Sequence, residues 1–407
     1  MDGWAVVRDL MFGVLAAIPL FFFFRKVVRL TRWWTIGATI LTAGLFAAGF
    51  VMSLACRAYG LDRLRLVATI LSSCITLVLY FALLSLLVCV MDIVWWAFTR
   101  PGQNDPADQF VGKHALIDED FPQAPPRNSN RIWAVRTSTV VVAALSAMIT
   151  GYGYVQAQSP TISPVTVSFP DLPSNFDRMT IALVTDVHIS SMTRSSFLPM
   201  VVDQINDARP DLIVIAGDIV DGTVANLGDR MSELKNLTAP YGVVVTLGNH
   251  ETYSGSEEWS RFFESLGLRV LTNDGILLTR GSQSVSLVGV ADLKQPGALA
   301  PDLARAVNRT GSCEDTFCIL AAHEPRQVLA DDGLASRLGI DLQLSGHTHG
   351  GQLWPLGYLT LFTQPAIDKV HAIDGVTLVT SRGVGTFRPP ERVGADPEIP
   401  LITLTAG

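Results

Sequence analysis

Residues 181–188 read Ile-Ala-Leu-Val-Thr-Asp-Val-His, an apolar run that ends in a carboxylate and an imidazole. A short apolar run of this kind is typical of a buried strand. Similar runs that lead into polar motifs are Leu212–Ala216, Val243–Leu247, Cys318–Ala322 and Asp341–Ser345. Helix-like apolar spacing occurs between strands, at Phe197–Ala208, Leu227–Leu237 and Glu257–Leu266. Strands that alternate with helices predict a layered α/β sandwich, with ligands gathered at the carboxyl ends of the strands.

The motifs at these strand ends carry five of the seven histidines in the chain. They are Asp186-Val187-His188, Gly217-Asp218-Ile219-Val220-Asp221, Gly248-Asn249-His250-Glu251, Ala322-His323-Glu324-Pro325 and Gly346-His347-Thr348-His349-Gly350-Gly351-Gln352. Imidazole nitrogens, carboxylate oxygens and one amide oxygen suit a hydrolytic centre of two metal ions that share a carboxylate. Each motif alone also fits a turn or a satisfied polar residue, but all five in this order favour the metal interpretation.

The order of these motifs resembles the calcineurin-like metallophosphoesterases over roughly Met179–Leu404. The resemblance implies a four-layer αββα sandwich, with two β-sheets face to face and helices outside. It also implies the metal ligands: Asp186, His188 and His349 for the first ion, Asn249, His323 and His347 for the second, and Asp218 as the bridge. His250 would protonate the leaving oxygen or bind the phosphoryl group, and Asp221 would orient its ring.

The C-terminal segment is similar to that of a bacterial subgroup of membrane-attached phosphodiesterases in this family. The stretches that carry this likeness are Gly289-Val290-Ala291-Asp292, Ser381-Arg382-Gly383-Val384-Gly385, Pro389-Pro390-Glu391-Arg392 and Pro397-Glu398-Ile399. Two interpretations are open for Arg382 and Arg392. Their guanidinium groups can hold a substrate phosphate by forked hydrogen bonds, or they can form structural salt bridges.

The residues predict metal-dependent phosphoester hydrolysis. Two cations about 3.5–4 Å apart polarise a phosphoryl oxygen and turn water into hydroxide near neutral pH. Ligands without thiolate suit manganese, iron or zinc, and the resemblance puts manganese first. We expect hydrolysis of phosphodiester or pyrophosphate bonds in a membrane-lipid or envelope-linked substrate. The alternatives are a broad phosphomonoesterase for small extracytoplasmic phosphates and a non-catalytic membrane structural or sensing protein.

Residues 1–155 are expected to form a membrane anchor of about four transmembrane helices. The expected spans are Leu10–Phe24, Thr35–Cys56, Leu66–Met91 and Thr137–Val155. The second and third runs are long enough to cross a hydrocarbon core of about 30 Å, whereas the first, of about 15 residues, is marginal. A polar loop is expected at 100–136 and an extended linker at 156–177. The catalytic domain would then occupy 178–407.

The distribution of basic residues predicts the orientation of this anchor. Basic residues gather before the second expected span, at Arg25, Lys26, Arg29 and Arg32, and before the fourth, at Arg100, Lys113, Arg127, Arg131 and Arg136. The stretch between Arg136 and Arg178 has no lysine or arginine, although Arg57–Arg65 carries three arginines. The positive-inside bias then places the catalytic domain outside the cytoplasm of a bacterial cell, on a multi-pass membrane protein.

Cysteine usage and net charge add two further expectations. Cys313 and Cys318, the cysteines of the expected catalytic domain, can form a disulfide in an oxidising compartment, and the sequence leaves this open. The formal net charge of −7 and the absence of a basic run in the catalytic half argue against nucleic acid as a partner. The expected partners are a phosphoester substrate and the lipid bilayer, and the oligomeric state stays open.

Overall fold

The computed structural model describes residues 17–27, 32–59, 62–99 and 129–407. The chain forms two compact units. One comprises Met1–Ala48 and Cys74–Thr150, and the other comprises Gly49–Ser73 and Gly151–Gly407. The second unit contains all the metal-ligand motifs, together with the end of the second helix and the start of the third.

Three long helices contain the apolar runs: α2 (Arg32–Tyr59), α3 (Arg65–Thr99) and α4 (Ser129–Gln156). The described residues include three stretches long and apolar enough to cross a membrane, namely Thr35–Cys56, Asp62–Trp95 and Thr137–Gln156. They coincide with the second, third and fourth expected spans. The expected span Leu10–Phe24 lies mostly outside the described residues, as does 100–128 of the expected loop. The rest of that loop, from Ser129, belongs to α4.

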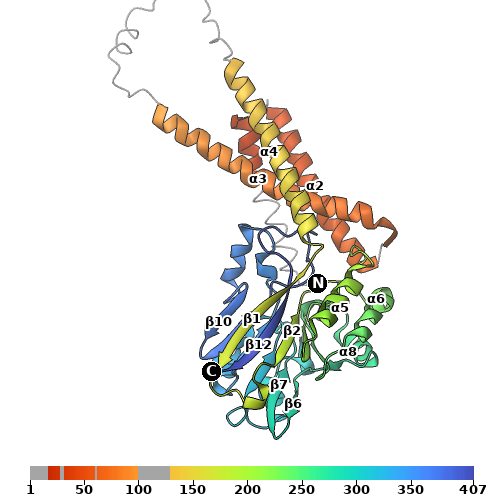
Figure 1. The fold of residues 1–407 in the computed structure, drawn as a ribbon. Coiled ribbons are helices and arrows are strands. Elements are labelled where there is room, and N and C mark those ends of the chain that lie inside the picture. The colour runs from red at the N-terminus through yellow and green to blue at the C-terminus, as the bar shows by residue number, and fades with distance from the viewer. Residues whose placement is uncertain (1–16, 28–31, 60–61, 100–128) are drawn as a thin grey trace, which may run out of the picture. The chain divides into compact units, whose positions relative to one another are not determined.

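Two six-stranded sheets form the centre of the second unit (Figure 1). The first has the order β1-β12-β2-β3-β4-β5 and the second β10-β11-β9-β8-β7-β6. The strands of the first sheet are β1 (Thr161–Phe169), β2 (Thr180–Val184), β3 (Leu212–Ala216), β4 (Val243–Thr246), β5 (Arg269–Val270) and β12 (Glu398–Ala406). Those of the second are β6 (Asp274–Arg280), β7 (Gln283–Gly289), β8 (Cys318–Ala321), β9 (Leu342–Ser345), β10 (Lys369–Ile373) and β11 (Val376–Thr380).

Parallel pairing brings the motif-bearing strand ends to one edge of each sheet. In the first sheet β2, β3, β4 and β5 are parallel neighbours, and in the second β7, β8, β9 and β11 are. Since every motif follows the carboxyl end of such a strand, the motifs of one sheet must emerge side by side. The strands β12, β6 and β10 are antiparallel to a neighbour and carry no ligand motif.

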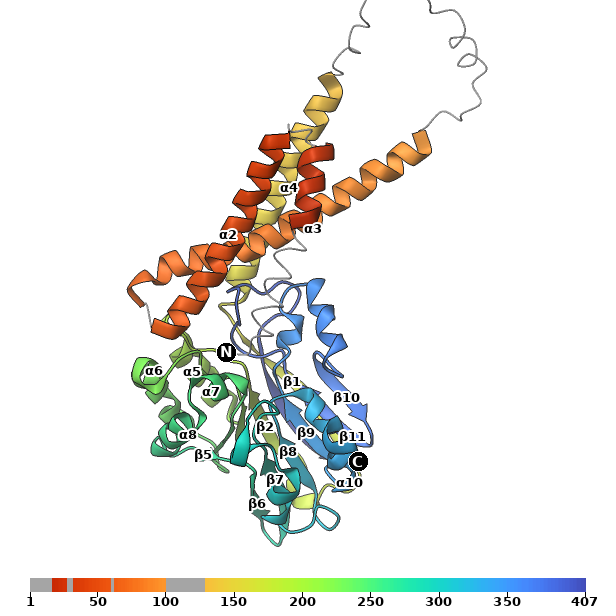
Figure 2. The same cartoon turned by 180° about the vertical axis from the view of Figure 1, so that it is seen from behind.

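Alternation along the strands builds three layers of core. Ile181 and Leu183 of β2 point between the sheets, where they meet Ile319 of β8, whereas Ala182 and Val184 point outward. The outward side of the first sheet is covered by α5 (Phe197–Ala208), α6 (Val224–Met231) and α8 (Ser256–Ser265). The outward side of the second is covered by α9 (Leu303–Asn308) and α10 (Ala330–Arg337). Figure 2 shows α10 beside β8, β9 and β11. The four-layer αββα architecture is therefore confirmed.

The segment 156–177, expected to be an extended linker, is only partly irregular. Its residues Thr161–Phe169 form β1, which pairs in parallel with β12 over its whole length. The side chains of Val167 and Phe169 are buried between the sheets. A strand with apolar residues on one face gains more from this pairing than from solvation, so the segment is part of the sheet and not a spacer.

Candidate metal centre

The first group of converging side chains comprises Asp186, His188 and His349, each with one atom that can bind a metal ion. The Nε2 atoms of His188 and His349 are 3.1 Å apart. Asp186 Oδ1 lies 3.4 Å from His349 Nε2 and 3.9 Å from His188 Nε2. All three side chains are buried. Lone pairs that face one another at this separation need a proton or a cation between them, so the donor set fits a metal ion.

The second group comprises Asp218, His323 and His347. His323 Nε2 lies 3.1 Å from Asp218 Oδ2 and 3.1 Å from His347 Nδ1. The family resemblance assigns Asn249 to this group as well, and its Oδ1 is buried without a hydrogen-bond partner among the described residues. An orphaned buried acceptor is costly unless a cation satisfies it. The second group therefore also fits a metal ion.

Asp218 faces both groups with a single oxygen. Its Oδ2 lies 3.1 Å from His323 Nε2 in the second group and 3.8 Å from His188 Nε2 in the first. Its other oxygen, Oδ1, accepts a hydrogen bond of 2.8 Å from the backbone N–H of His250. The carboxylate is thus held between the two groups, with Oδ2 toward both.

The ligand-bearing loops share a strained backbone conformation. Asp186, His188, Asp218, His347 and His349 have φ values of 54°, 48°, 54°, 70° and 53°. Non-glycine residues adopt this left-handed region only when the surrounding structure imposes it, at a cost of about 1–3 kcal/mol each. Such strain gathers at functional sites, and no composition or spacing pattern in the sequence signalled it.

His250 is held by the carboxylate that the sequence predicts. Its Nδ1 is hydrogen-bonded to Asp221 Oδ1, and its Nε2 lies 3.7 Å from Asp218 Oδ2. Asp221 Oδ2 also lies 3.3 Å from His188 Nδ1. Burial would raise the pKa of Asp221, but the facing imidazoles of His250 and His188 hold it well below its ordinary value. Burial lowers the pKa of His250, and the carboxylates of Asp218 and Asp221 oppose this only in part. The contact fixes the ring, with Nε2 directed at the centre.

Glu251 supports the centre from behind, a role that its motif alone did not reveal. Its fully buried carboxylate accepts hydrogen bonds from the backbone N–H groups of Gly248, Asp218, Ile219 and Val220, at 2.8, 2.9, 2.7 and 3.0 Å. The residue lies three positions after Gly248, at the start of α7 (Asn249–Ser254), as in a capping box. That spacing is the signal that could have found it. One side chain therefore ties together the loops after β3 and β4.

Glycine is required where these loops approach one another. A Cβ built on Gly248 would collide with Asp218 Oδ1, and one built on Gly346 would collide with Asp186 Oδ2. Both acceptors are carboxylate oxygens of candidate ligands. The glycines of these two motifs therefore let the ligand carboxylates pack against backbone.

The two C-terminal arginines bond to other groups of the chain. Arg392 is fully buried, and its guanidinium donates to the carbonyl oxygens of Gly385, His349 and Ala395 at 2.7, 3.2 and 3.1 Å. Its Nη2 lies 3.3 Å from His349 Nδ1. Arg382 forms a salt bridge of 2.7 Å with Glu398, which was the alternative interpretation. The predicted phosphate contact of Arg392 is corrected to support of His349, because backbone carbonyls take up its donors.

A family model for calcineurin-like phosphoesterases matches residues 179–351. An uncharacterized metallophosphoesterase of Bacillus subtilis, YkuE, is 30% identical over 62% of this chain and 90% of its own length. A Danio rerio transmembrane protein with a metallophosphoesterase domain is 30% identical over 65% of this chain and 62% of its own. A 5′-nucleotidase precursor from Thermus thermophilus aligns with 55% of this chain and 54% of its own, at 17% identity and a TM-score of 0.36. The chain spans 54–64% of the length of the first five curated relatives.

Proposed function

Because this chain belongs to the calcineurin-like metallophosphoesterases, we propose that it hydrolyses phosphodiester or pyrophosphate bonds in a membrane-lipid or envelope-linked substrate. The observation that carries the proposal is the position of Asp218 Oδ2, 3.1 Å from His323 Nε2 and 3.8 Å from His188 Nε2. One carboxylate oxygen that faces two groups of ligand atoms is the arrangement of two-metal phosphoester hydrolases.

The residues divide into two candidate ligand sets. Asp186, His188 and His349 would hold one ion, Asn249, His323 and His347 the other, and Asp218 both. When bound, divalent ions supply Lewis-acid polarisation of the phosphoryl group and activation of water. The ligands combine carboxylate, amide and imidazole groups without thiolate, which suits manganese, iron or zinc, and we propose manganese first.

His250 is the candidate group for proton transfer to the leaving oxygen. Its Nδ1 is committed to Asp221, so only Nε2 is free to meet a substrate, and this atom faces Asp218. His250 belongs neither to the group around Asp186 nor to the group around Asp218, but its ring converges with Asp221 and His188 in a third group of side chains that could hold a metal ion. We propose that the ring donates a proton or a hydrogen bond to the phosphoryl group through Nε2 and does not serve as a ligand.

A cavity beside the first ligand group supports a lipid substrate. It has a volume of about 280 Å³, and His188 and Asp221 are among its lining residues. Its other walls lie in the same compact unit and combine apolar and basic side chains, including Leu66, Tyr154 and Phe387 with Arg65, Arg194 and Arg388. Residues of α3 and α4, the helices that contain candidate membrane spans, thus contribute to the wall. Apolar surface with nearby cations matches a phosphate-bearing lipid.

The proposed reaction is tested with full-length protein purified in detergent and loaded with manganese. Hydrolysis of bis(4-nitrophenyl) phosphate is compared with that of 4-nitrophenyl phosphate, and then a phospholipid in mixed micelles with its phosphomonoester product. We expect a higher kcat/KM for both diesters. A higher value for the monoesters would replace the proposal with a broad phosphomonoesterase. Failure to hydrolyse any of them with two equivalents of metal bound would contradict the proposed phosphodiesterase activity.

We also propose that the catalytic domain lies outside the cytoplasm of a bacterial cell. The distribution of basic residues supports this orientation, and so does the disulfide between Cys313 and Cys318, since such bonds persist in oxidising compartments. Protease added to intact spheroplasts should cleave the chain after Val155. Cleavage only after lysis would reverse the orientation.

A further inference from the structure

A short helix after the last ligand motif has an exposed apolar face. This helix is η8 (Leu356–Phe362), a 3₁₀ helix. Its exposed large apolar residues, each with 45% to 86% of its surface exposed, are Tyr358, Leu359, Leu361 and Phe362. In the described residues of 157–407, the other exposed large apolar residues are Leu277, Leu329, Trp354 and Val370. A cluster such as that of η8 marks a contact with a protein or a lipid surface, whereas single exposed apolar residues are ordinary.

The chain around η8 carries no charge. Residues 350–367 contain no lysine, arginine, histidine, aspartate or glutamate, in a chain in which 16% of the residues are charged. Surface that faces water normally carries charged side chains of both signs. A protein partner that is recognised by complementary charge has nothing to pair with here. The environment that fits η8 is therefore apolar.

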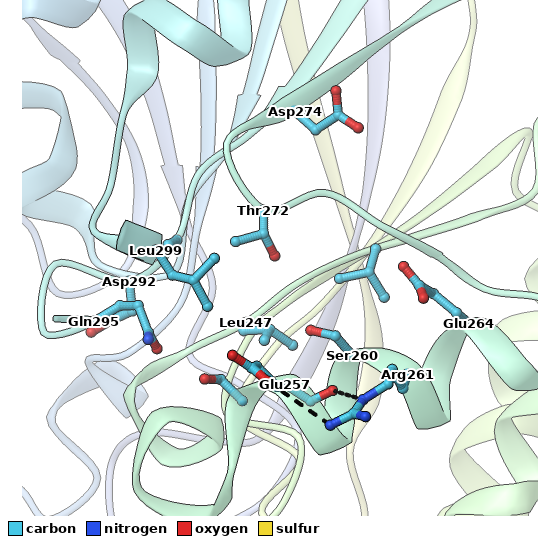
Figure 3. Close-up of a pocket in the computed structure, with 13 residues that line it drawn as sticks. Leu247, Glu257, Ser260, Arg261, Glu264, Thr272, Asp274, Asp292, Gln295 and Leu299 are labelled. Carbon is cyan, nitrogen blue, oxygen red and sulfur yellow. Dashed lines mark hydrogen bonds and ion pairs between the residues drawn. The ribbon is translucent and has the colours of Figure 1, made fainter. Parts of the chain in front are cut away.

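The exposed face of α8 differs from that of η8. Figure 3 shows Glu257, Ser260, Arg261 and Glu264 of α8 beside a cavity of about 510 Å³. Glu257 and Arg261 form an ion pair at 3.9 Å, and both side chains are largely exposed. A charged helix face of this kind is suited to water. Although α8 and η8 belong to the same compact unit, their exposed faces are thus suited to different surroundings.

Backbone contacts hold the start of η8 close to the end of α4. The N–H of Trp354 donates a hydrogen bond of 2.8 Å to the carbonyl oxygen of Val393, and that of Arg392 donates one of 3.0 Å to the carbonyl oxygen of Gly153 in α4. Val393 also packs on Gly153, since a Cβ built there would lie 2.8 Å from Val393 Cγ2. All four residues belong to one compact unit, and Gly153 lies within the candidate membrane span Thr137–Gln156. η8 is therefore held near the point where the chain leaves that span.

The end of α4 has side chains typical of a membrane surface. Tyr152 and Tyr154, in its last turns, are both exposed. Tyrosine and tryptophan gather where the hydrocarbon of a membrane meets water, because their rings are apolar and their polar atoms stay hydrated. An exposed apolar helix beside such residues is suited to lie in the plane of the interface.

The chain after η8 is connected to the candidate metal centre. Gln364, which follows η8, donates a hydrogen bond of 2.9 Å to Glu324 and accepts one of 3.0 Å from the backbone N–H of Arg326. Glu324 directly follows the candidate ligand His323, and the candidate ligand His349 precedes η8 in the chain. η8 thus lies in a segment that is fixed at both ends to loops with candidate ligands.

We propose that η8 inserts into the interface of the bilayer at the end of α4, and that this contact holds the candidate metal centre at the level of the lipid head groups. Contact with lipid removes the apolar side chains of η8 from water, which is the driving force for such insertion. The inference needs α4 as a membrane span. It goes beyond the proposed phosphodiesterase activity and does not depend on it.

Photo-crosslinking of the full-length protein in nanodiscs of dioleoyl phosphatidylcholine tests this contact. Tyr358 and Phe362 are replaced in turn by p-benzoylphenylalanine, and mass spectrometry after irradiation identifies the molecule that the probe has joined. We expect phospholipid adducts at both positions. The same probe at Leu277 of β6, an exposed apolar residue outside the cluster, and at Glu264 on the polar face of α8 should give no lipid adduct.

A second variant tests whether the apolar side chains drive the contact. Leu361→Ser combined with Phe362→Ser should lower the yield of lipid adduct from the probe at Tyr358 several-fold, because less apolar surface is available to enter the interface. Leu277→Ser, which removes an exposed leucine elsewhere, is the matched control and should leave that yield unchanged. An equal yield in all three proteins would overturn insertion by η8.

The identity of the adducts separates the bilayer from other partners. Adducts of Tyr358 and Phe362 with a second copy of the chain, or with another segment of the same chain, would replace the lipid by a protein contact and overturn the inference. Lipid adducts of equal yield at Leu277 and Glu264 would also overturn it. Lipid adducts confined to η8 in a protein that hydrolyses no phosphodiester would support the membrane contact and contradict the proposed activity.

Discussion

The candidate ligands differ from the two buried charged side chains that hold their loops, Glu251 and Arg392, which we call the supports. The two sets differ in how their hydrogen-bonding groups are satisfied. In the loops, Asn249 Oδ1 has no hydrogen-bond partner among the described residues. Behind them, Glu251 accepts four backbone N–H groups and Arg392 donates to three backbone carbonyls. A candidate ligand atom thus lacks a hydrogen-bond partner, whereas the polar groups of Glu251 and Arg392 have theirs. Mutation of a ligand should change metal binding, and mutation of a support should change stability.

The backbone shows the same division. Five of the seven candidate ligands have left-handed backbone conformations, and the supports bond to the loops of two of them, Asp218 and His349. Glu251 bonds to the N–H groups of Asp218 and its two successors, and Arg392 to the carbonyl of His349. Strain of about 1–3 kcal/mol per residue persists only where the surroundings over-determine the conformation. The supports are therefore the means by which the fold keeps the ligands in place before any ion binds.

The largest effect is expected from Asp218→Ala. Because Asp218 Oδ2 faces both ligand groups, its loss should lower metal occupancy at both positions, whereas His323→Ala should affect the second preferentially. Elemental analysis of the purified full-length variants measures this, with the exposed Asp203→Ala as control. Two full equivalents of metal in Asp218→Ala would contradict the bridging assignment.

His250→Ala should have the next largest effect, on turnover alone. Since Nδ1 of His250 bonds to Asp221 and the ring is in neither of the two proposed ligand sets, both metals should be retained. Turnover of an alkyl phosphodiester should fall by roughly 10²–10⁴-fold, the usual contribution of general acid–base catalysis. A nitrophenyl diester should lose less, because its leaving oxygen needs less protonation.

Two outcomes would change the role given to His250. Equal slowing of the alkyl and nitrophenyl esters would remove the acid role and leave phosphoryl binding. Loss of a metal ion from His250→Ala would mean that the ring of His250 is itself a metal ligand.

Glu251→Gln should act on stability more than on metal stoichiometry. The substitution replaces one of the two acceptor oxygens by an NH₂ group, so at least one buried N–H group of the Asp218 loop loses its partner. We expect a loss of about 2 kcal/mol in the free energy of unfolding, the scale for a buried hydrogen-bonding group left without a partner. Thermal unfolding of the metal-free protein measures it, with the exposed Glu314→Gln as control. An unchanged midpoint of thermal unfolding would show that Glu251 does not stabilise the loops.

The candidate ligand motifs could be placed from the sequence and Glu251 could have been found by its capping-box spacing, but the position of Arg392 and the pairing of β1 could not, for a physical reason. Each ligand motif follows its own strand, so local apolar periodicity and side-chain chemistry are enough to place it. The position of Arg392 depends on carbonyls of Gly385 and His349 in a folded loop, and that of β1 on pairing with β12, which begins 237 positions after Thr161 at Glu398. Periodicity within a segment carries no information about such distant partners.

Arg382→Gln should have the smallest effect, and it addresses the expectation that remains from the sequence. The guanidinium of Arg382 is 28% exposed and pairs with Glu398 at 2.7 Å. If this salt bridge is its whole role, unfolding free energy should fall by about 0–1 kcal/mol and KM for a phosphodiester should not change. If Arg382 also holds a substrate phosphate, KM should rise while stability is nearly constant. Steady-state kinetics of Arg382→Gln and Arg382→Lys distinguish the salt-bridge role from the phosphate contact. Lysine keeps the positive charge but cannot donate two parallel hydrogen bonds to a phosphate. A raised KM in both variants would place Arg382 among the residues that contact substrate.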